Sequence, residues 1–269
     1  MNQSRMLYGA NVRANGIRQH YLRFGGKGQA LVLVPGITSP AVTWAFVAER
    51  LARDFDTYVL DVRGRGLSET TPGMDYSMEA CAADVAALTQ ALGLQDYILL
   101  GHSMGARIGA LVAARPDCVA ERLVMVDPPV SGPGRRPYPA ALPWYMDSIR
   151  LMREGQPWER LREFSPTWTQ EQLQLRAEWL HTCDEEAVVQ AFQSFQTDDF
   201  HRGLPDIRIP AQLVVAGRGG VIQADDAAEL CRLMPGLVVT RVENAGHMIP
   251  WDDYEGFFSA LREFLPVAG

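Results

Sequence analysis

The amino-acid sequence predicts an α/β fold, with a mostly parallel sheet of eight strands and helices on both faces. Short, continuous apolar runs such as residues 30–34 and 97–100 are typical of strands that are buried on both faces of a parallel sheet. These runs alternate with stretches of helical apolar spacing, as expected for a sheet that is covered by helices. The length of 269 residues fits one such domain with an insertion.

The first part of the chain opens with a predicted β-hairpin. Two apolar segments flank Arg13-Ala14-Asn15-Gly16, and Asn-Gly is a strong signal for a hairpin turn. A helix that follows Ser77 is expected to end at Gly93, because glycine is common just after the last helical turn. The expected elements are, in order, strands 6–12, 17–24 and 30–34, helix 41–53, strand 57–60 and helix 78–92.

The alternation continues, is interrupted once, and then resumes. The expected elements are strand 97–100, helix 104–114, strand 122–126, strand 212–216, helix 225–233, strand 237–241 and helix 252–265. Between the third and fourth of these, residues 131–202 contain several prolines, four of the six tryptophans and no apolar run of the strand type. We therefore expect an α/β core at 1–130 and 203–269, with 131–202 inserted as a helical cap.

Composition excludes several classes of protein. The net charge of −7 and the absence of a basic run argue against a nucleic-acid partner. No segment has the apolar character of a signal peptide or a membrane span. The four cysteines are scattered and lack metal-type spacing, so reduced thiols and no metal site are expected. A cytoplasmic protein that does not bind membranes is the expectation; the oligomeric state stays open.

Gly101-His102-Ser103-Met104-Gly105 matches the G-x-S-x-G pattern of a nucleophile elbow. It follows a predicted buried strand directly and opens a predicted helix, the setting in which such a serine stands clear of the sheet. A serine needs a base to act as a nucleophile. His247 follows the last predicted strand, so it is expected at the same sheet edge as Ser103. The sequence therefore predicts Ser103 as nucleophile and His247 as its base.

The elbow, the position of His247 and the segment Asp61-Val-Arg-Gly-Arg-Gly-Leu-Ser68 resemble the α/β-hydrolase superfamily over essentially the whole chain. In most members the acid follows the seventh strand, but here Gly217-Arg218-Gly219-Gly220 stands at that turn. The resemblance and the end of strand 122–126 both indicate Asp127 as the acid that orients His247. The resemblance also implies that the backbone N–H groups of Ile37 and Met104 form the oxyanion hole.

Three segments are similar to a narrower family, the N-formylmaleamate deformylases of aerobic nicotinate breakdown. They are residues 35–44, residues 61–66 and Val126-Asp-Pro-Pro129. Hydrolases that open acylaminomethylene-succinates are a related group. The resemblance implies hydrolysis of N-formylmaleamate to maleamate and formate through a formyl-serine, with no metal or organic cofactor.

The implied substrate is a small anion, so a local positive charge is expected. Residues 131–162 hold six arginines against three acids, and one of the six is expected to clamp the carboxylate. The candidate substrate contacts are Thr38, Ser39, Arg150, Arg153, Trp144 and Trp158.

Three other functions remain open at this point. The same catalytic residues serve carboxylesterases and hydrolases of carbon–carbon bonds, and a cofactor-free perhydrolase would belong to another reaction class. A ligand receptor with this fold would not be an enzyme at all. Dehalogenases and epoxide hydrolases are disfavoured, because they have aspartate in place of Ser103.

Overall fold

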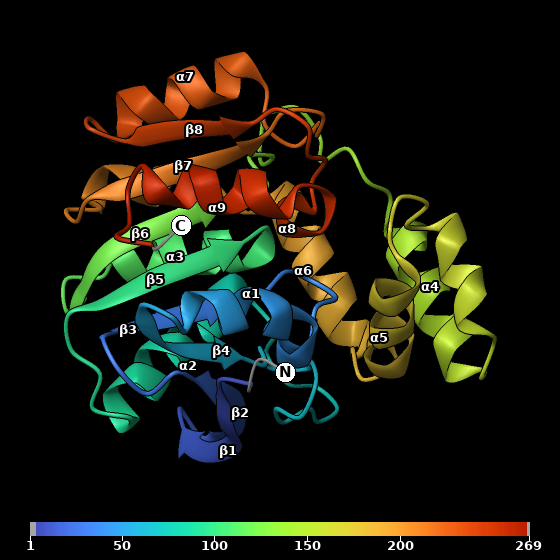
Figure 1. Cartoon of the computed structure of the whole chain (residues 1–269). Coiled ribbons are helices and arrows are strands. Elements are labelled where there is room, and N and C mark those ends of the chain that lie inside the picture. Colours follow the sequence, from blue (N-terminus) through green and yellow to red (C-terminus); the bar gives the residue numbers. More distant parts are fainter. Residues whose placement is uncertain (1–3, 268–269) are drawn as a thin grey trace.

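The computed structural model describes residues 4–267, which form one eight-stranded sheet with helices on both faces (Figure 1). The strand order is β1-β2-β4-β3-β5-β6-β7-β8. The β1–β2 and β2–β4 pairs are antiparallel and the other pairs are parallel, so the sheet is mostly parallel, as predicted. The strands are β1 (Met6–Ala14), β2 (Ile17–Phe24), β3 (Gln29–Val34), β4 (Phe55–Leu60), β5 (Tyr97–His102), β6 (Ala120–Val126), β7 (Ala211–Ala216) and β8 (Val238–Val242).

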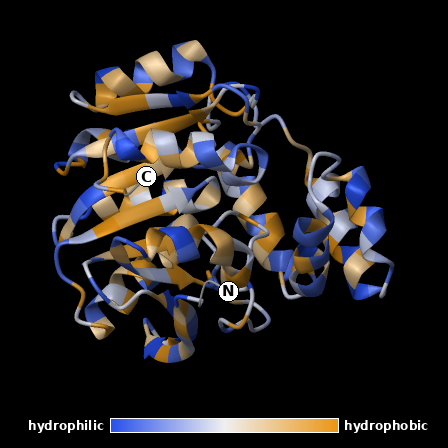
Figure 2. Cartoon of the chain, viewed as in Figure 1, coloured by the Kyte–Doolittle hydropathy of each residue, from blue (hydrophilic) through white to orange (hydrophobic). Residues whose placement is uncertain are grey.

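The central strands are apolar on both sides, because helices cover both faces of the sheet. Every residue of β4, β5 and β7 is buried, and the hydropathy colouring shows β5 and β7 as largely hydrophobic (Figure 2). The opening hairpin is built as its sequence predicts. Asn15 and Gly16 both have positive φ, 51° and 77°, which is the conformation of a two-residue type I′ turn.

The helices divide between two hydrophobic clusters, one on each face of the sheet. Helices α1, α8 and α9 pack on one face, while α2, α3 and α7 pack on the other. These helices are α1 (Ala45–Leu51), α2 (Met78–Ala91), α3 (Met104–Ala113), α7 (Ala224–Leu233), α8 (Ile249–Asp252) and α9 (Tyr254–Arg262). Within residues 4–267, no helix is long and apolar enough to cross a membrane.

Two expected helices are interrupted in the structure. The segment expected at 41–53 begins as the 3₁₀ helix η1 (Ala41–Trp44) before α1 starts. The closing segment expected at 252–265 is divided at Asp253, whose φ of −146° and ψ of 82° are not helical. The Asp253 side chain accepts a hydrogen bond from the Gly256 N–H and so caps α9. Periodicity alone does not reveal such a cap inside an apolar pattern.

Residues 131–202 contain helices and no strand within the described part of the chain. Helices α4, α5 and α6 lie beyond the carboxyl ends of the parallel strands (Figure 1). The elements are α4 (Leu142–Arg153), η2 (Trp158–Glu163), α5 (Gln170–Leu180), α6 (Glu185–Thr197) and η3 (Phe200–Asp206). The segment thus stands at the sheet edge where ligands of open α/β sheets bind.

Candidate active site

Ser103 occupies a strained turn between β5 and α3. Its φ of 54° and ψ of −119° lie outside the regions that most side chains adopt. The turn is possible because Gly101 and Gly105 have no side chain, so neighbouring backbone segments can approach them closely. A Cβ atom at Gly101 would lie 2.2 Å from the Gly105 carbonyl oxygen, and one at Gly105 would lie 1.9 Å from the Val34 carbonyl oxygen. Both glycines of the G-x-S-x-G pattern are therefore required by sterics.

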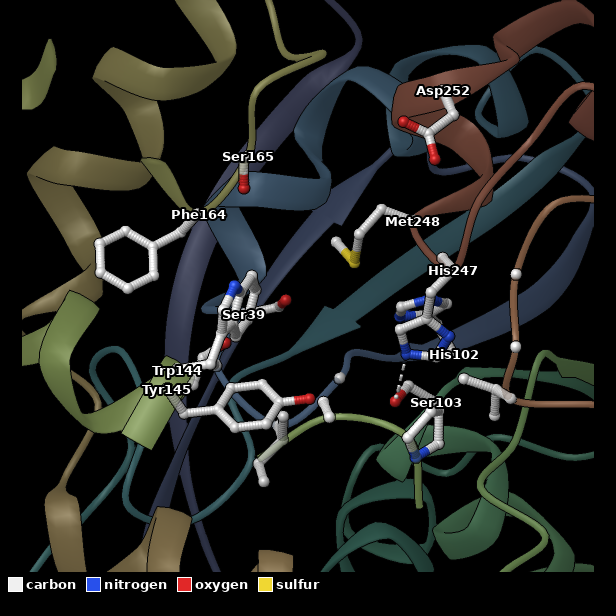
Figure 3. Close-up of a pocket in the computed structure, with 18 of the residues that line it drawn as sticks. Ser39, His102, Ser103, Trp144, Tyr145, Phe164, Ser165, His247, Met248 and Asp252 are labelled. Atoms are coloured by element: carbon white, nitrogen blue, oxygen red, sulfur yellow. Dashed lines mark hydrogen bonds between the residues drawn. The ribbon is translucent and has the colours of Figure 1, made fainter. Parts of the chain in front are cut away.

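The structure brings Ser103, His247 and Asp127 together at the carboxyl edge of the sheet. Ser103 Oγ lies 3.0 Å from His247 Nε2, a hydrogen bond drawn in Figure 3. His247 Nδ1 lies 2.7 Å from Asp127 Oδ2. Asp127 is fully buried, and its Oδ1 accepts a hydrogen bond from the Ala216 N–H at 3.3 Å. This chain of contacts lets a proton move from the serine hydroxyl to a histidine that a carboxylate holds in place.

The two acids that follow β7 do not reach His247. Asp225 and Asp226 lie in the first turn of α7, where carboxylates are favoured by the helix dipole. Asp226 Oδ2 accepts hydrogen bonds from the Gln223 N–H and from Arg136 Nη2. In the structure, then, the acid beside the histidine comes from the end of β6.

His102, the neighbour of Ser103, supports the backbone of His247. His102 Nε2 lies 2.9 Å from the His247 carbonyl oxygen. The His102 ring is buried 5.2 Å from the Trp44 ring and 5.0 Å from the His247 ring, measured between centroids. Burial, and to a smaller extent the nearby His247, lower the pKa of His102 to about 3. His102 is therefore neutral at ordinary pH and donates from Nε2.

Ile37 and Met104 flank Ser103 from two different elements. Met104 is the first residue of α3, so its N–H belongs to the first helical turn, where backbone donors have no partner inside the helix. Ile37 follows β3 and lines the cavity beside Ser103. The buried Arg65 holds this loop, since its Nε donates to the Ile37 carbonyl oxygen at 3.1 Å. The loop after β3 and the first turn of α3 thus both lie beside Ser103.

A cavity of about 600 Å³ opens in front of Ser103 and His247. Thr38 and Ser39 line it from the core, and Trp144 and Tyr145 line it from α4. Figure 3 shows Trp144, Tyr145 and Phe164 across the cavity from Ser103 and His247. The cavity is therefore enclosed by the core on one side and by residues 131–202 on the other.

Three of the expected substrate contacts are corrected by the structure. Arg150 and Arg153 do not line the cavity; both form ion pairs with Glu185 on α6, on the partly exposed surface of the insertion. Trp158 begins η2 and packs against the hydrophobic core instead of the cavity. Helical spacing could not show this, because the position of Glu185 relative to α4 depends on how the helices pack.

The other four arginines of 131–162 are engaged as well. Arg135 pairs with Glu229, Arg136 with Asp226 and Arg160 with Glu163, while Arg162 Nη1 lies 3.5 Å from the Trp168 carbonyl oxygen. The expectation that one of these six faces Ser103 is therefore wrong.

The sequence did not indicate several residues of the cavity wall, and three of them carry polar groups near the site. Arg176 lies on α5, outside the arginine-rich stretch. The Tyr138 hydroxyl lies 3.5 Å from His247 Nε2 and 3.1 Å from the Tyr145 hydroxyl. Asp252 accepts hydrogen bonds from the Gly246 N–H and the Thr167 hydroxyl, and burial raises the pKa of its carboxyl. No local sequence signal distinguishes these residues from others on their helices and loops.

A stack of indole rings joins the insertion to the core beside the cavity. The rings of Trp168 and Trp251 are stacked, with centroids 5.5 Å apart and planes 11° apart. Trp251 also meets Trp44 edge-on at 4.7 Å.

Within residues 4–267, no group of three or more histidine, cysteine or carboxylate side chains could hold a metal ion.

Comparison with known proteins identifies relatives over nearly the full chain. The family described as the alpha/beta hydrolase fold matches residues 29–254. An N-formylmaleamate deformylase of Pseudomonas putida is 62% identical over 262 residues, which cover 97% of this chain and 98% of the relative. A 2-(acetamidomethylene)succinate hydrolase of Mesorhizobium japonicum is 26% identical and covers 91% of this chain and 90% of its own length.

Two solved structures of proteins with the same functions as these relatives are similar to the structure of this chain. The crystal structure of a serine-to-alanine variant of the N-formylmaleamic acid deformylase from Pseudomonas putida S16 has a TM-score of 0.91 and 56% identity. The match covers 95% of this chain and 100% of that one. A structure of E-2-(acetamidomethylene)succinate hydrolase, with a TM-score of 0.77 and 23% identity, shares the fold.

Proposed function

This chain belongs to the alpha/beta hydrolase fold family, and we propose that it hydrolyses N-formylmaleamate to maleamate and formate. It is a hydrolase, as the resemblance in its sequence implies. The observation that carries the substrate is the 62% identity to N-formylmaleamate deformylase over 97% of the chain, together with a serine, histidine and aspartate in hydrogen-bond contact at the cavity.

In the proposed first half of the reaction, Ser103 Oγ attacks the formyl carbon while His247 Nε2 takes the hydroxyl proton. The developing oxyanion accepts hydrogen bonds from the N–H groups of Ile37 and Met104. A donor of this kind is worth about 3–4 kcal/mol in comparable sites. Asp127 stabilises the imidazolium that forms. The bond between the formyl carbon and nitrogen then breaks, and His247 gives its proton to the nitrogen, so maleamate leaves as a neutral amide bearing its carboxylate.

In the second half, water attacks the formyl-serine. His247 takes a proton from the water, the bond from carbon to Ser103 Oγ breaks, and the serine regains its proton. Formic acid leaves and loses its proton, and the sum is one N-formylmaleamate and one water converted to one maleamate, one formate and one proton. The leaving nitrogen lies between two carbonyl groups, which makes it a better leaving group than an ordinary amine.

Residues 131–202 act in this proposal as a cap on a core of 1–130 and 203–269. Trp144 and Tyr145 support the role, since they form the cavity wall opposite Ser103. A closed wall of aromatic side chains limits bulk water around the reacting bond. A cytoplasmic location and a role in nicotinate breakdown belong to the same proposal, as does a small anion in place of a nucleic acid or membrane partner.

The test compares formate release from N-formylmaleamate with hydrolysis of p-nitrophenyl acetate. We expect kcat/KM to be higher for N-formylmaleamate, and Ser103→Ala to abolish both activities. A higher kcat/KM for the ester would favour a carboxylesterase, and formation of peracid from acetate and peroxide would favour a perhydrolase. Binding without turnover of any of these compounds would favour a receptor.

A further inference from the structure

Arg176 is a buried cation that has no carboxylate partner within the described part of the chain. Its side chain lies on α5, and only 5% of the residue is exposed. Nη2 donates to the Thr38 hydroxyl at 3.1 Å and Nη1 to the Thr38 carbonyl oxygen at 3.4 Å. Nε has no hydrogen-bond partner among residues 4–267. A buried arginine normally has its charge paired and its donors satisfied, and Arg176 meets neither condition.

The other buried arginines show what a structural role requires. Arg50 and Arg63 form ion pairs with Glu255 and Asp84. Arg65 and Arg107 instead donate to backbone carbonyl oxygens, those of residues 37, 63 and 187 for Arg65 and those of residues 131 and 198 for Arg107. None of these four arginines lines the large cavity, whereas Arg176 does. Among residues 4–267, Arg176 is the only lysine or arginine in the wall of that cavity.

Arg176 also lies close to the reacting centre. Its guanidinium binds Thr38, which directly follows Ile37, the proposed oxyanion donor. The guanidinium carbon lies 5.6 Å from the centroid of the Trp168 ring, so one face of the cation is packed against an aromatic wall. Desolvation lowers the pKa of Arg176, which reflects the cost of keeping this charge away from water. A ligand that carried a negative charge into the cavity would offset that cost.

A second charged side chain of the cavity, Asp252, favours one orientation of an anionic ligand. Asp252 lines the same cavity, but its carboxylate bonds the Gly246 N–H and the Thr167 hydroxyl and forms no ion pair with Arg176. An anionic group is repelled from the Asp252 side and attracted to the Arg176 side. In N-formylmaleamate, one carbonyl, the nitrogen and a double bond separate the formyl carbon from the carboxylate. Ser103, Thr38 and Arg176 line the same cavity, so both ends of the molecule would lie within it.

We propose that Arg176 binds the carboxylate of the substrate and so selects small monoanionic N-acyl amides whose acyl carbon then lies at Ser103. The planar guanidinium suits two parallel hydrogen bonds to a carboxylate. This inference rests on the proposed function for the name of the substrate, but the anion site itself rests on the unpaired cation.

The first experiment measures KM and kcat of wild type and Arg176→Gln on N-formylmaleamate and on its neutral methyl ester. Glutamine keeps a donor for Thr38 but removes the charge. We expect kcat/KM for the anion to fall about 100-fold or more, as when one partner of a buried charge pair is removed. The value for the methyl ester should change little. Arg150→Gln is the matched control, because Arg150 pairs with Glu185 on the surface; its kinetics should equal wild type. An equal loss on both substrates in Arg176→Gln would overturn the inference.

The second experiment separates a binding role from a structural one. Removal of an uncompensated buried charge should leave the Tm of Arg176→Gln equal to or above that of wild type. Maleate should raise the Tm of wild type and of Ser103→Ala but not of Arg176→Gln. A marked fall in Tm for Arg176→Gln, or the same shift by maleate in all three proteins, would overturn the inference.

Two outcomes keep this inference distinct from the proposed function. If wild type releases no formate but maleate raises its Tm through Arg176, the deformylase proposal fails and the anion site stands. If wild type releases formate and Arg176→Gln is kinetically unchanged, the anion site fails alone. If Arg176→Gln does not fold, Arg176→Lys replaces it in these experiments. We expect Arg176→Lys to have a higher KM than wild type for the anion and an unchanged KM for the methyl ester. A KM for the anion equal to that of wild type would count against the site.

Discussion

The carboxylate of Asp127 lies against the backbone of Gly219, so that a Cβ atom at Gly219 would be 3.5 Å from Asp127 Oδ2. The same atom would be 2.7 Å from the Ala216 Cβ, too close for a side chain to fit without movement. The residues that follow β6 and β7 therefore lie next to each other, and one carboxylate, that of Asp127, lies between these two segments and His247. The loop after β7 thus comes within van der Waals range of the carboxylate that Asp127 supplies from the end of β6.

Asp127→Asn should lower kcat about 10⁴-fold, because an amide holds the wrong tautomer of the histidine and cannot stabilise its cation. Asp225→Asn, on the first turn of α7, should retain wild-type kcat. Steady-state formate release from the two variants checks this. Near-normal turnover by Asp127→Asn, or a collapse in Asp225→Asn, would assign the acid elsewhere.

Ser103→Ala should lower kcat about 10⁴- to 10⁶-fold while the fold is kept, because the nucleophile is lost but the turn is not. The circular dichroism spectrum and Tm should match those of wild type. If this variant kept more than about a tenth of the wild-type rate, a mechanism through formyl-serine would be excluded.

Gly105→Ala should destabilise the protein by more than about 4 kcal/mol or prevent folding, because the added Cβ would lie 1.9 Å from a backbone oxygen of β3. Gly109→Ala, one turn later on α3, is the matched control. Its Cβ would lie 3.3 Å from the end of the flexible Leu123 side chain, and alanine favours helix by about 1 kcal/mol. Urea unfolding compares the two; similar losses in both would contradict the steric account of the elbow.

The free energy of unfolding should decrease as pH falls from about 6.5 towards 3, in part because of His102. The unfolded chain takes up a proton at this histidine below its ordinary pKa, whereas the folded protein resists protonation down to a pKa of about 3. The contribution is complete above pH 6.5 and is lost through this window. The buried His201, whose pKa is also lowered by burial, adds a dependence of the same sign.

Urea unfolding of wild type and His102→Gln across this pH range measures the difference. The glutamine can still donate to the His247 carbonyl oxygen but cannot titrate, so the decrease should be shallower. The exposed His181→Gln serves as the control and should keep the wild-type slope. Parallel curves for wild type and His102→Gln would show that His102 is not the source.

The fold could be predicted from the sequence because its strands are continuous apolar runs and because parallel strands bring their carboxyl ends to one edge. That rule places Ser103, Asp127 and His247 at the same edge although 144 residues separate the first from the last. The spacing of the arginines in residues 131–162 could not show their partners, since Arg150 and Arg153 meet Glu185 only after α4 packs on α6. Arg176 was not predicted as a substrate contact for the same reason. Its local sequence does not show that, in the fold, it has no acidic partner.

The stacked indoles of Trp168 and Trp251 give the protein a built-in optical reporter. Trp168 belongs to the segment 131–202 and Trp251 to α8, so their 5.5 Å separation couples the emission of two parts of the chain that are far apart in sequence. Any event that separates the rings would alter intrinsic fluorescence. Because Trp168 lines the cavity, entry of substrate and release of product change the surroundings of one of these rings, and a stopped-flow fluorimeter could follow them with no added dye.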